Sequence, residues 1–493
     1  MNNVDLSKSK YCNAICCEKL LWLNKYKPEC ATETDNTSSF ENGKRVGELA
    51  KSLFGDYEDI GYDKNKPVMI EKTDRLLKEK PNIITEASFM YDNNFCRVDI
   101  LKNDLDGVEI YEVKSSTEVK DTHLDDAAYQ YYVLSNLELN VKKVCIVYLN
   151  KEYVRGKELN IRELFNIADI TQIVKDKQME IKSNIDYINR FMTEYGENDE
   201  PESRIDIKCI DPDFCPYWEH CSRDLPKPNV FDIVGMNKSK KIEKYNENKI
   251  SFEDLQNEDL NPKYLEQIDF ELNDRKPKIE KEAINKTLDL LKYPLYFIDY
   301  ETYNTPIPEI EGTRPYQPLP FQYSLHILKD ENAELEHKEF LAESDDKEFI
   351  RHFAENLIKD LSEDGSVIIY SNYEHTINNN ISNRFPDLEE DINRINSNLV
   401  DFLPIFKQHN YYMKEMNGSA SIKDVLPALC PELDYSKLPL IHKGDEASEA
   451  FKSLKNKNHE EQEEIRDALL QYCELDTYAM VKIYEKFKEI MVE

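Results

Sequence analysis

The sequence lacks the features that mark secreted and membrane proteins. Among its 493 residues, no apolar run approaches the roughly 20 residues that a membrane-spanning helix needs. The opening residues, MNNVDLSKSKYCN, include no apolar signal segment. We therefore expect a cytoplasmic protein with no membrane partner.

Cationic residues are also scarce, because 64 lysines and arginines face 97 aspartates and glutamates. The net charge of −33 argues against non-specific attraction to nucleic acid. A phosphate backbone can bind only where a basic groove or bound cations overcome the negative electrostatic field of the protein. The 12 glycines, beside abundant Lys, Asn, Ile and Tyr, indicate an AT-rich genome and not a function.

Paired CxxC knuckles, the usual zinc signature, are absent although the chain has 11 cysteines. A reducing compartment disfavours disulfide bonds, so a cluster of these cysteines indicates a metal site. Three thiols lie within thirteen residues, namely Cys209, Cys215 and Cys221. A fourth is available from the early segment, which holds Cys12, Cys16 and Cys17. Four thiols suit zinc or an iron–sulfur cluster.

The hydrophobic pattern alternates between helical and strand periods in both halves of the chain. In the first half we expect helices over 6–22, 44–54, 125–137 and 171–194, and strands over 82–91, 94–101, 108–114 and 143–149. In the second half we expect strands over 293–300, 320–328, 335–341 and 366–372, and helices over 346–361, 401–408, 421–429 and 459–489.

This alternation predicts an α/β protein with two mixed sheets. We expect a first domain at 1–224, a helical connector at 225–290 and a second domain at 291–493. Within the connector, residues 231–255 are either a small helical hairpin that touches a nucleic-acid backbone or a solvated linker.

Two carboxylates follow an apolar run in LYFIDYET at 295–302. Asp299 and Glu301 are two residues apart, so they share one face of a strand. Acids on one face of a half-buried strand repel each other, which favours a divalent cation between them and a phosphate. The alternative is a strand whose wet face is merely acidic.

Partners for this pair occur downstream. Glu374 follows a strand in VIIYSNYEHT, and Asp401 is a competing acid. Tyr472 and Asp476 are at positions i and i+4, one turn apart on one face of a helix.

A similar pattern occurs in the first half. Asp99 ends a strand-like run, and Glu112 and Lys114 lie two residues apart on the next strand. Two acids and a lysine can hold Mg²⁺ or Mn²⁺ and activate a water. Gln130, on the following helix, can buttress the site. Glu86 and Glu48 are weaker candidates for a further acid.

The Asp…Glu-x-Lys pattern with its following helix resembles the RecB-like branch of the PD-(D/E)XK nuclease superfamily. The resemblance implies Asp99, Glu112 and Lys114 as catalytic residues and Gln130 as a supporting one. Many members carry a histidine on the early helix, where this chain has Val46-Gly47-Glu48. That difference leaves a second metal ligand open.

The cysteine spacing resembles that of iron–sulfur RecB-family nucleases, in which a cluster pins the N-terminal helix to the end of the nuclease domain. By register with SKSKY and CEKLLWL, the resemblance implies a 4Fe-4S cluster held by four thiols: Cys17, Cys209, Cys215 and Cys221. Cys12 and Cys16 remain alternatives for the first ligand.

The acids of the second half resemble the DEDD exonucleases of the RNase H-like (DnaQ) superfamily, in the tyrosine-containing subtype. The resemblance implies four acids that hold two cations about 4 Å apart, namely Asp299, Glu301, Glu374 and Asp476. Tyr472 would orient the water. The second motif of these exonucleases usually has an aspartate, so Glu374 and Asp401 both remain candidates for the acid of this motif.

Longer motifs, PLYFIDYET, EGTRPYQPLPFQYSLHIL, GSASIKDVLPAL and YCELDT, resemble the bacterial family known as domain of unknown function 2779. In that family a RecB-like half precedes a DnaQ-like half. The resemblance implies a metal-dependent nuclease that cuts DNA single strands or ends, with a 3′→5′ exonuclease centre, in repair, recombination or defence. Candidate substrate contacts are Arg314, Tyr316, Gln317, Gln322, Ser419, Ser421 and Lys423.

Two other functions are compatible with these motifs. One is a nucleic-acid-binding or assembly protein in which one or both centres are inactive. The other is a zinc-stabilised RNA-processing exonuclease.

Overall fold

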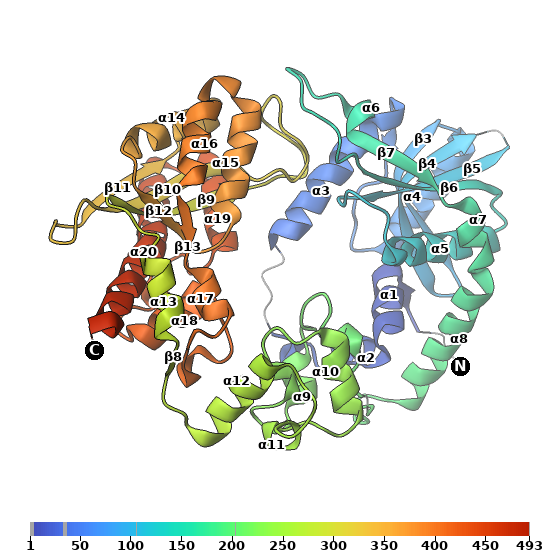
Figure 1. Cartoon of the computed structure of the whole chain (residues 1–493). Coiled ribbons are helices and arrows are strands. Elements are labelled where there is room, and N and C mark those ends of the chain that lie inside the picture. Colours follow the sequence, from blue (N-terminus) through green and yellow to red (C-terminus); the bar gives the residue numbers. More distant parts are fainter. Residues whose placement is uncertain (1–3, 33–36, 105, 203, 493) are drawn as a thin grey trace. The chain divides into compact units, whose positions relative to one another are not determined.

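The computed structural model describes residues 4–32, 37–104, 106–202 and 204–492 (Figure 1). The chain forms two compact units. Unit 1 consists of Met1–Asp224 and Thr305–Gln317, and unit 2 consists of Leu225–Asn304 and Pro318–Glu493. The prediction of an α/β protein with mixed sheets is confirmed. Over the described ranges, no helix combines the length and apolar character needed to cross a membrane.

The described part of unit 1 contains one mixed sheet of seven strands. They are β1 (Leu6–Ser7), β2 (Glu58–Asp59), β3 (Ile83–Tyr91), β4 (Asn94–Asp104), β5 (Gly107–Lys114), β6 (Val141–Leu149) and β7 (Phe165–Asp169). Strands β3, β4 and β5 form an antiparallel meander, whereas β5 and β6 are parallel. A parallel pair needs a crossover, and helix α5 (Asp121–Asn136) supplies it.

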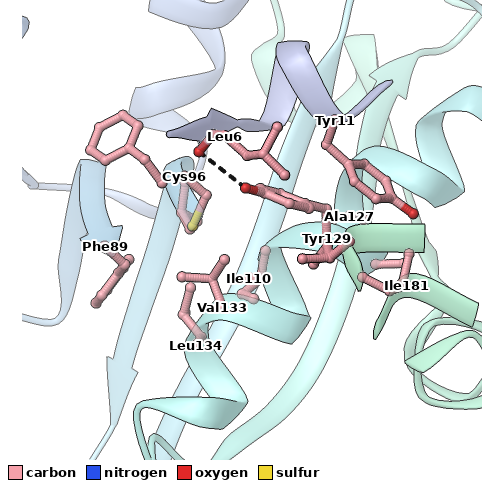
Figure 2. Packing of buried hydrophobic residues seen from close by; sticks show 14 of the residues in the cluster. Leu6, Tyr11, Phe89, Cys96, Ile110, Ala127, Tyr129, Val133, Leu134 and Ile181 are labelled. Atoms are coloured by element: carbon pink, nitrogen blue, oxygen red, sulfur yellow. Dashed lines mark hydrogen bonds between the residues drawn. The ribbon is translucent and has the colours of Figure 1, made fainter. Parts of the chain in front are cut away.

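Helix α5 provides much of the apolar packing in unit 1. It buries Ala127, Tyr129 and Val133, and the Tyr129 ring stacks on Tyr11 with the ring centroids 4.8 Å apart. Figure 2 shows these side chains and the hydroxyl of Tyr129, which donates a hydrogen bond to Leu6 O at 3.2 Å. The same helix therefore fixes both the sheet and the N-terminal segment.

The expected single helix over 6–22 is wrong at Cys17. Helix α1 (Lys8–Cys16) ends there and α2 (Glu18–Tyr26) begins, while Cys17 is extended with φ −159° and ψ 119°. An unbroken helix would place Glu18 on the face of the buried Tyr11 and Ala14. The break avoids burying that charge. The expected helix over 171–194 likewise divides at Lys177 into α7 (Thr171–Asp176) and α8 (Gln178–Glu194).

Unit 2 has a mixed sheet of five strands among its described residues, in the order β11-β10-β9-β12-β13. They are β9 (Leu295–Tyr303), β10 (Leu319–Leu328), β11 (Glu336–Leu341), β12 (Ser366–Ile369) and β13 (Leu399–Asp401). Strand β10 is antiparallel to both neighbours, and β9, β12 and β13 are parallel. The helix expected from residue 401 is corrected, because Asp401 ends a strand and α17 (Leu403–Lys407) follows it.

Helices cover both faces of the unit 2 sheet. On one face, Tyr300 and Tyr323 pack edge-on against Phe353 of α14 (Phe349–Asp360), with centroid distances of 5.1 and 5.3 Å. Alternate residues point to the other face, where Gln322 donates a hydrogen bond to Leu469 O of α20 (His459–Val492) at 2.8 Å. The period of two along β9 and β10 thus directs their polar side chains toward α20.

Residues 225–290, expected as a separate connector, belong to unit 2. They form α10 (Lys238–Asn246), α11 (Phe252–Leu255), α12 (Pro262–Asn273), α13 (Lys281–Leu288) and β8 (Lys278–Ile279). Strand β8 pairs with β14 (Tyr411–Tyr412). Conversely, residues 305–317, which connect β9 to β10, belong to unit 1.

The remaining helices complete the two units. They are α3 (Thr37–Lys51), α4 (Lys66–Glu79), α6 (Ile161–Leu164), α9 (Trp218–Ser222), α15 (Tyr373–Arg384), α16 (Glu389–Ser397), α18 (Ile422–Leu429) and α19 (Gly444–Ser453).

Tyr129→Phe tests the packing of the N-terminal segment. The change leaves the ring in place and removes the donor to the Leu6 carbonyl, so we expect the free energy of unfolding to fall by about 1 kcal/mol. Denaturant titration measures it. Tyr131→Phe is the control, because the Tyr131 hydroxyl makes no hydrogen bond to a described residue and its loss should change little. Equal effects of the two changes would contradict the assignment.

Candidate functional sites

The unit 2 site begins on β9, the central strand of its sheet. Asp299 and Glu301 both point to the face covered by α20, as their spacing predicts. On α20, Asp476 lies one turn after Tyr472. One carboxylate oxygen each of Asp299, Glu301 and Asp476 lies within 4.8 Å of the other two. Glu301 and Asp476 are 7% and 6% exposed, so this is a cluster of acids largely out of water.

Glu374, the fourth predicted acid, lies on the first turn of α15, directly after β12. It is outside the group of three, but its charge helps to raise the pKa of Asp299. Its side chain is buried, and Oε2 has no hydrogen-bond partner among the described residues. The competing Asp401 accepts a hydrogen bond from Leu403 N at 2.8 Å and is less buried. A buried carboxylate oxygen without a partner is better suited to a cation than one that already accepts from a backbone N–H.

Three further groups that the sequence did not identify as a set surround these acids. The Tyr435 hydroxyl donates to Asp476 Oδ1 at 2.6 Å. Lys423 Nζ donates to the Tyr472 hydroxyl at 2.8 Å. Gly444 opens α19, and a Cβ at this position would lie 3.6 Å from Glu301 Oε2. The positive end of that helix dipole therefore faces a carboxylate.

The electrostatics of the acids follow from their burial. Burial and repulsion by Asp476 raise the pKa of both Asp299 and Glu301 well above the usual range for carboxyls. Burial and the neighbouring acids raise the pKa of Glu374 to about 8. Burial raises the pKa of Asp476 to about 6 although Tyr435 donates to it. The cluster holds more negative charge than Lys423 alone neutralises, and carboxylate oxygens are the ligands that Mg²⁺ and Mn²⁺ prefer.

The unit 1 site lies where β4 and β5 run side by side. Asp99 on β4 accepts a hydrogen bond from Val113 N at 2.7 Å, and burial together with repulsion by Glu112 on β5 raises the pKa of Asp99 to about 7. Glu112 is 1% exposed. Its Oε2 accepts from Gln130 Nε2, while Gln130 Oε1 is buried without a partner among the described residues. An acid pair beside an unpaired buried amide oxygen fits a cation.

Two lysines neutralise this site. Lys114 Nζ lies 3.0 Å from Glu112 Oε1 and also contacts Asp126. Lys8, from the start of α1, forms an ion pair with the same Oε1 of Glu112. The two ammonium groups hold the pKa of Glu112 well below its usual range.

Sequence reasoning missed Lys8 and Asp126. Asp126 was detectable, since it lies four residues before Gln130 on α5 and therefore on the same helix face. Lys8 gives no local signal, because its partner Glu112 is 104 residues away in the chain.

Glu48 and Glu86, the weaker candidates for a further acid, form ion pairs elsewhere. The Glu48 side chain is 56% exposed and contacts Lys51. Glu86, at φ 58°, forms an ion pair with Arg97 at 2.9 Å.

Most of the expected substrate-contact residues already have partners within the fold. Arg314 pairs with Glu152 at 3.0 Å, and the Tyr316 hydroxyl donates to Ser115 O at 2.6 Å. Gln317 Oε1 accepts from Arg314 N. Gln322 is fully buried. Ser419 donates to Asp424, and Ser421 caps α18. Lys423 alone in this set reaches the acid cluster, through Tyr472.

The four cysteines predicted as cluster ligands line one cavity of about 250 Å³ in unit 1. These are Cys17, Cys209, Cys215 and Cys221. Burial, together with the other thiols, raises the pKa of Cys209 to about 11. Zn–S bonds of about 2.3 Å place tetrahedral ligand sulfurs about 3.8 Å apart. No three cysteine sulfurs in the described ranges lie within 4.8 Å of one another.

The alternative first ligands differ in position. Cys12 Sγ donates to Asp126 at 2.9 Å, so it lies at the carboxylate site of unit 1. Cys16 lines the cysteine cavity but is exposed. Cys17 lies in the break between α1 and α2, half-buried at the cavity.

The chain matches the model of one protein family over residues 296–421. This family is described as Domain of unknown function (DUF2779). The matched range includes all of β9 except its first residue, and it includes Glu374, but it covers neither α20 nor the first part of unit 1. Neither a curated protein nor a solved structure matches the chain.

The raised pKa values predict how pH acts on the metal-free protein. Between the ordinary carboxyl pKa of about 4 and the folded values of about 6 and about 8, the folded state binds more protons than the unfolded state. The contribution of this cluster to stability therefore falls as pH rises through that window. Mg²⁺ should restore it, by about 2–3 kcal/mol at saturation.

Thermal unfolding in chelator and in Mg²⁺, at about pH 5 and about pH 8, measures this effect. The gain from Mg²⁺ should be larger at the higher pH. Asp299→Asn should remove most of the difference, whereas Glu339→Gln on the exposed strand β11 should preserve it. A gain that is the same in wild type and Asp299→Asn would show that Mg²⁺ binds elsewhere.

Proposed function

We propose that the chain is a divalent-metal-dependent nuclease with two centres, one in each unit. The observation that carries the proposal is the convergence of Asp299, Glu301 and Asp476 within 4.8 Å, although Asp476 follows the two β9 acids by more than 170 residues in the chain. Burying acids together is unfavourable unless they bind cations, and two-cation carboxylate sites hydrolyse phosphodiesters.

In unit 2, the proposed reaction is removal of nucleotides from a 3′ end. The three clustered acids and Glu374 would hold Mg²⁺ or Mn²⁺, which when bound lowers the pKa of water and neutralises charge on the phosphate. Tyr435 donates to Oδ1 of Asp476, which would orient this carboxylate to hold the cation.

Tyr472 fits the role of orienting the attacking water. Its oxygen already accepts from Lys423, so its own proton is available to a water or a carboxylate. Lys423 also supplies positive charge close to the site where a phosphate would lie. The Tyr472 side chain is fixed by packing, because it is 2% exposed.

In unit 1, Asp99 and Glu112 would hold a cation with Gln130 Oε1 as a further oxygen. Lys114, placed between Glu112 and Asp126, would orient the water or stabilise the charged phosphate in the transition state. This arrangement supports cleavage of DNA single strands or ends.

One observation favours a second function for unit 1. Lys8 neutralises Glu112, and so the site has less need of a cation than the unit 2 site. A binding role for unit 1, with catalysis confined to unit 2, is therefore the alternative. Whether the substrate is DNA or RNA is decided by the assay below.

The finer fold assignments belong to the same proposal. A five-stranded mixed sheet with acids on its central strand and on a C-terminal helix supports an RNase H-like domain. A meander followed by a parallel strand, with Asp99 and Glu112 on adjacent strands, supports a PD-(D/E)XK domain.

Iron–sulfur ligation is the proposed role of the cysteine cavity. Cys17, Cys209, Cys215 and Cys221 would hold the cluster, which would tie the break between α1 and α2 to the segment 209–221. Four thiols that line one cavity are a ligand set typical of such a cluster. Lys8 begins α1, so this tie would also fix the N-terminal lysine at Glu112.

Variants of the two centres should give different product patterns on end-labelled single-stranded DNA and RNA with Mn²⁺. Asp299→Asn should slow 3′ trimming by about 10³-fold or more, because a cation site is worth several kcal/mol. Lys114→Ala should abolish a separate set of products. Glu339→Gln and Lys143→Ala are the matched controls, since both residues lie on strands of the same sheets outside the sites.

The outcomes of that assay are distinct. No cleavage by wild type with any divalent metal would reject the nuclease and favour the binding function. Loss of trimming alone, with no products that depend on Lys114, would assign unit 1 to binding. Cleavage of RNA but not of DNA would identify RNA as the substrate.

Anaerobic purification tests the cysteine cavity. We expect about four irons and as many acid-labile sulfides per chain. Cys215→Ala and Cys221→Ala should lose them, whereas Cys430→Ala, in unit 2, should not. A colourless, zinc-loaded wild-type protein would contradict the cluster.

A further inference from the structure

A second group of metal-ligating side chains lies in unit 2, apart from the four acids. His326 on β10 and His337 on β11 are directly opposite each other in the antiparallel register, with ring centroids 4.5 Å apart. Glu474 projects from α20 beside them, its Oε1 4.0 Å from His337 Nδ1. One ligand atom from each of the three residues lies within 4.8 Å of the others.

Two buried hydroxyls determine which nitrogen of each ring carries its proton. Thr477 donates its single hydroxyl proton to Glu474 O at 3.0 Å. Its oxygen can then only accept, so His326 Nδ1, at 2.8 Å, is the donor and is protonated.

The same reasoning extends to His337. Ser324 Oγ lies 2.7 Å from Thr477 Oγ1 and must donate to it. The Ser324 oxygen is therefore left to accept from His337 Nε2 at 2.9 Å. Each ring thus holds its proton on the nitrogen that faces a hydroxyl.

This hydrogen-bond network leaves Nε2 of His326 and Nδ1 of His337 as lone-pair donors. His326 is 4% exposed, and its Nε2 has no hydrogen-bond partner among the described residues. Metal-bound histidines characteristically have the other ring nitrogen fixed in this way by a hydrogen-bonding neighbour. Two imidazoles and one carboxylate are a ligand set typical of zinc with one position left for water.

We propose that His326, His337 and Glu474 bind a divalent transition-metal ion of the zinc class. The ligands come from three elements, β10, β11 and α20, so the ion would join the edge of the sheet to the helix. Glu474 lies between Tyr472 and Asp476 in the sequence, and the ion would therefore fix the turn of α20 that presents both residues to β9.

The site differs from the four-acid cluster in ligand chemistry. Oxygen-only ligands favour Mg²⁺ or Mn²⁺, whereas imidazole nitrogen favours zinc. The proposal does not depend on nuclease activity, because its test measures bound metal.

The test measures zinc bound per full-length chain after equilibration with Zn²⁺ in excess Mg²⁺. Wild type should bind one more equivalent than His337→Ala, and Glu474→Gln should weaken binding of that equivalent. Both side chains are partly exposed, so these variants should fold. His352→Ala is the matched control, since His352 pairs with Asp346 at 2.6 Å but no third metal-binding side chain among the described residues joins them.

Thr477→Val tests the network itself. It keeps all three ligands and removes the group that orients His326, so affinity for that equivalent should fall by about 10–100-fold. Asp299→Asn should retain the equivalent, which separates it from the acid cluster. Equal zinc content in wild type and His337→Ala would overturn the proposal, as would loss of the equivalent in His352→Ala.

Discussion

Repulsion between buried carboxylates is the interaction on which the design of both units depends. Each unit places acids on adjacent structural elements at the centre of its sheet, where water cannot screen them. In unit 1, two lysines of the chain itself offset the repulsion, because Lys8 and Lys114 contact Glu112. In the described part of unit 2, Lys423 reaches the acids through Tyr472, Tyr435 donates to Asp476, and the start of α19 faces Glu301. Burial and repulsion by Asp476 still raise the pKa of Asp299 and Glu301 well above the usual range for carboxyls.

The residues that the sequence identified are those whose geometry is local. A spacing of two on β9 and of four on α20 already places Asp299 with Glu301 and Tyr472 with Asp476 on shared faces. Strand positions were close for the same reason, since β3 was expected at 82–91 and spans Ile83–Tyr91. The α/β class follows from this periodicity.

What could not be predicted depends on contacts between distant segments. Lys8 and Tyr435 acquire their roles only when the fold brings them to Glu112 and Asp476. The break at Cys17 arises because the face that α1 buries would include Glu18 if the helix continued. Arg314 and Tyr316 were expected at a substrate, yet they are held by Glu152 and Ser115. Their loop is part of unit 1, which the order of residues along the chain does not reveal.

That loop gives the chain an interleaved architecture. It leaves the strand that carries Asp299 and Glu301, contributes Tyr316 to the carbonyl one residue after Lys114, and returns to form β10. A fragment that stops at residue 224 would keep both acids and the lysine of the first site but lose Tyr316, which packs against a hydrophobic cluster of unit 1 and donates to Ser115 O. Neither half of the sequence is therefore a complete structural unit, because residues 305–317 of unit 1 lie within the stretch that otherwise builds unit 2.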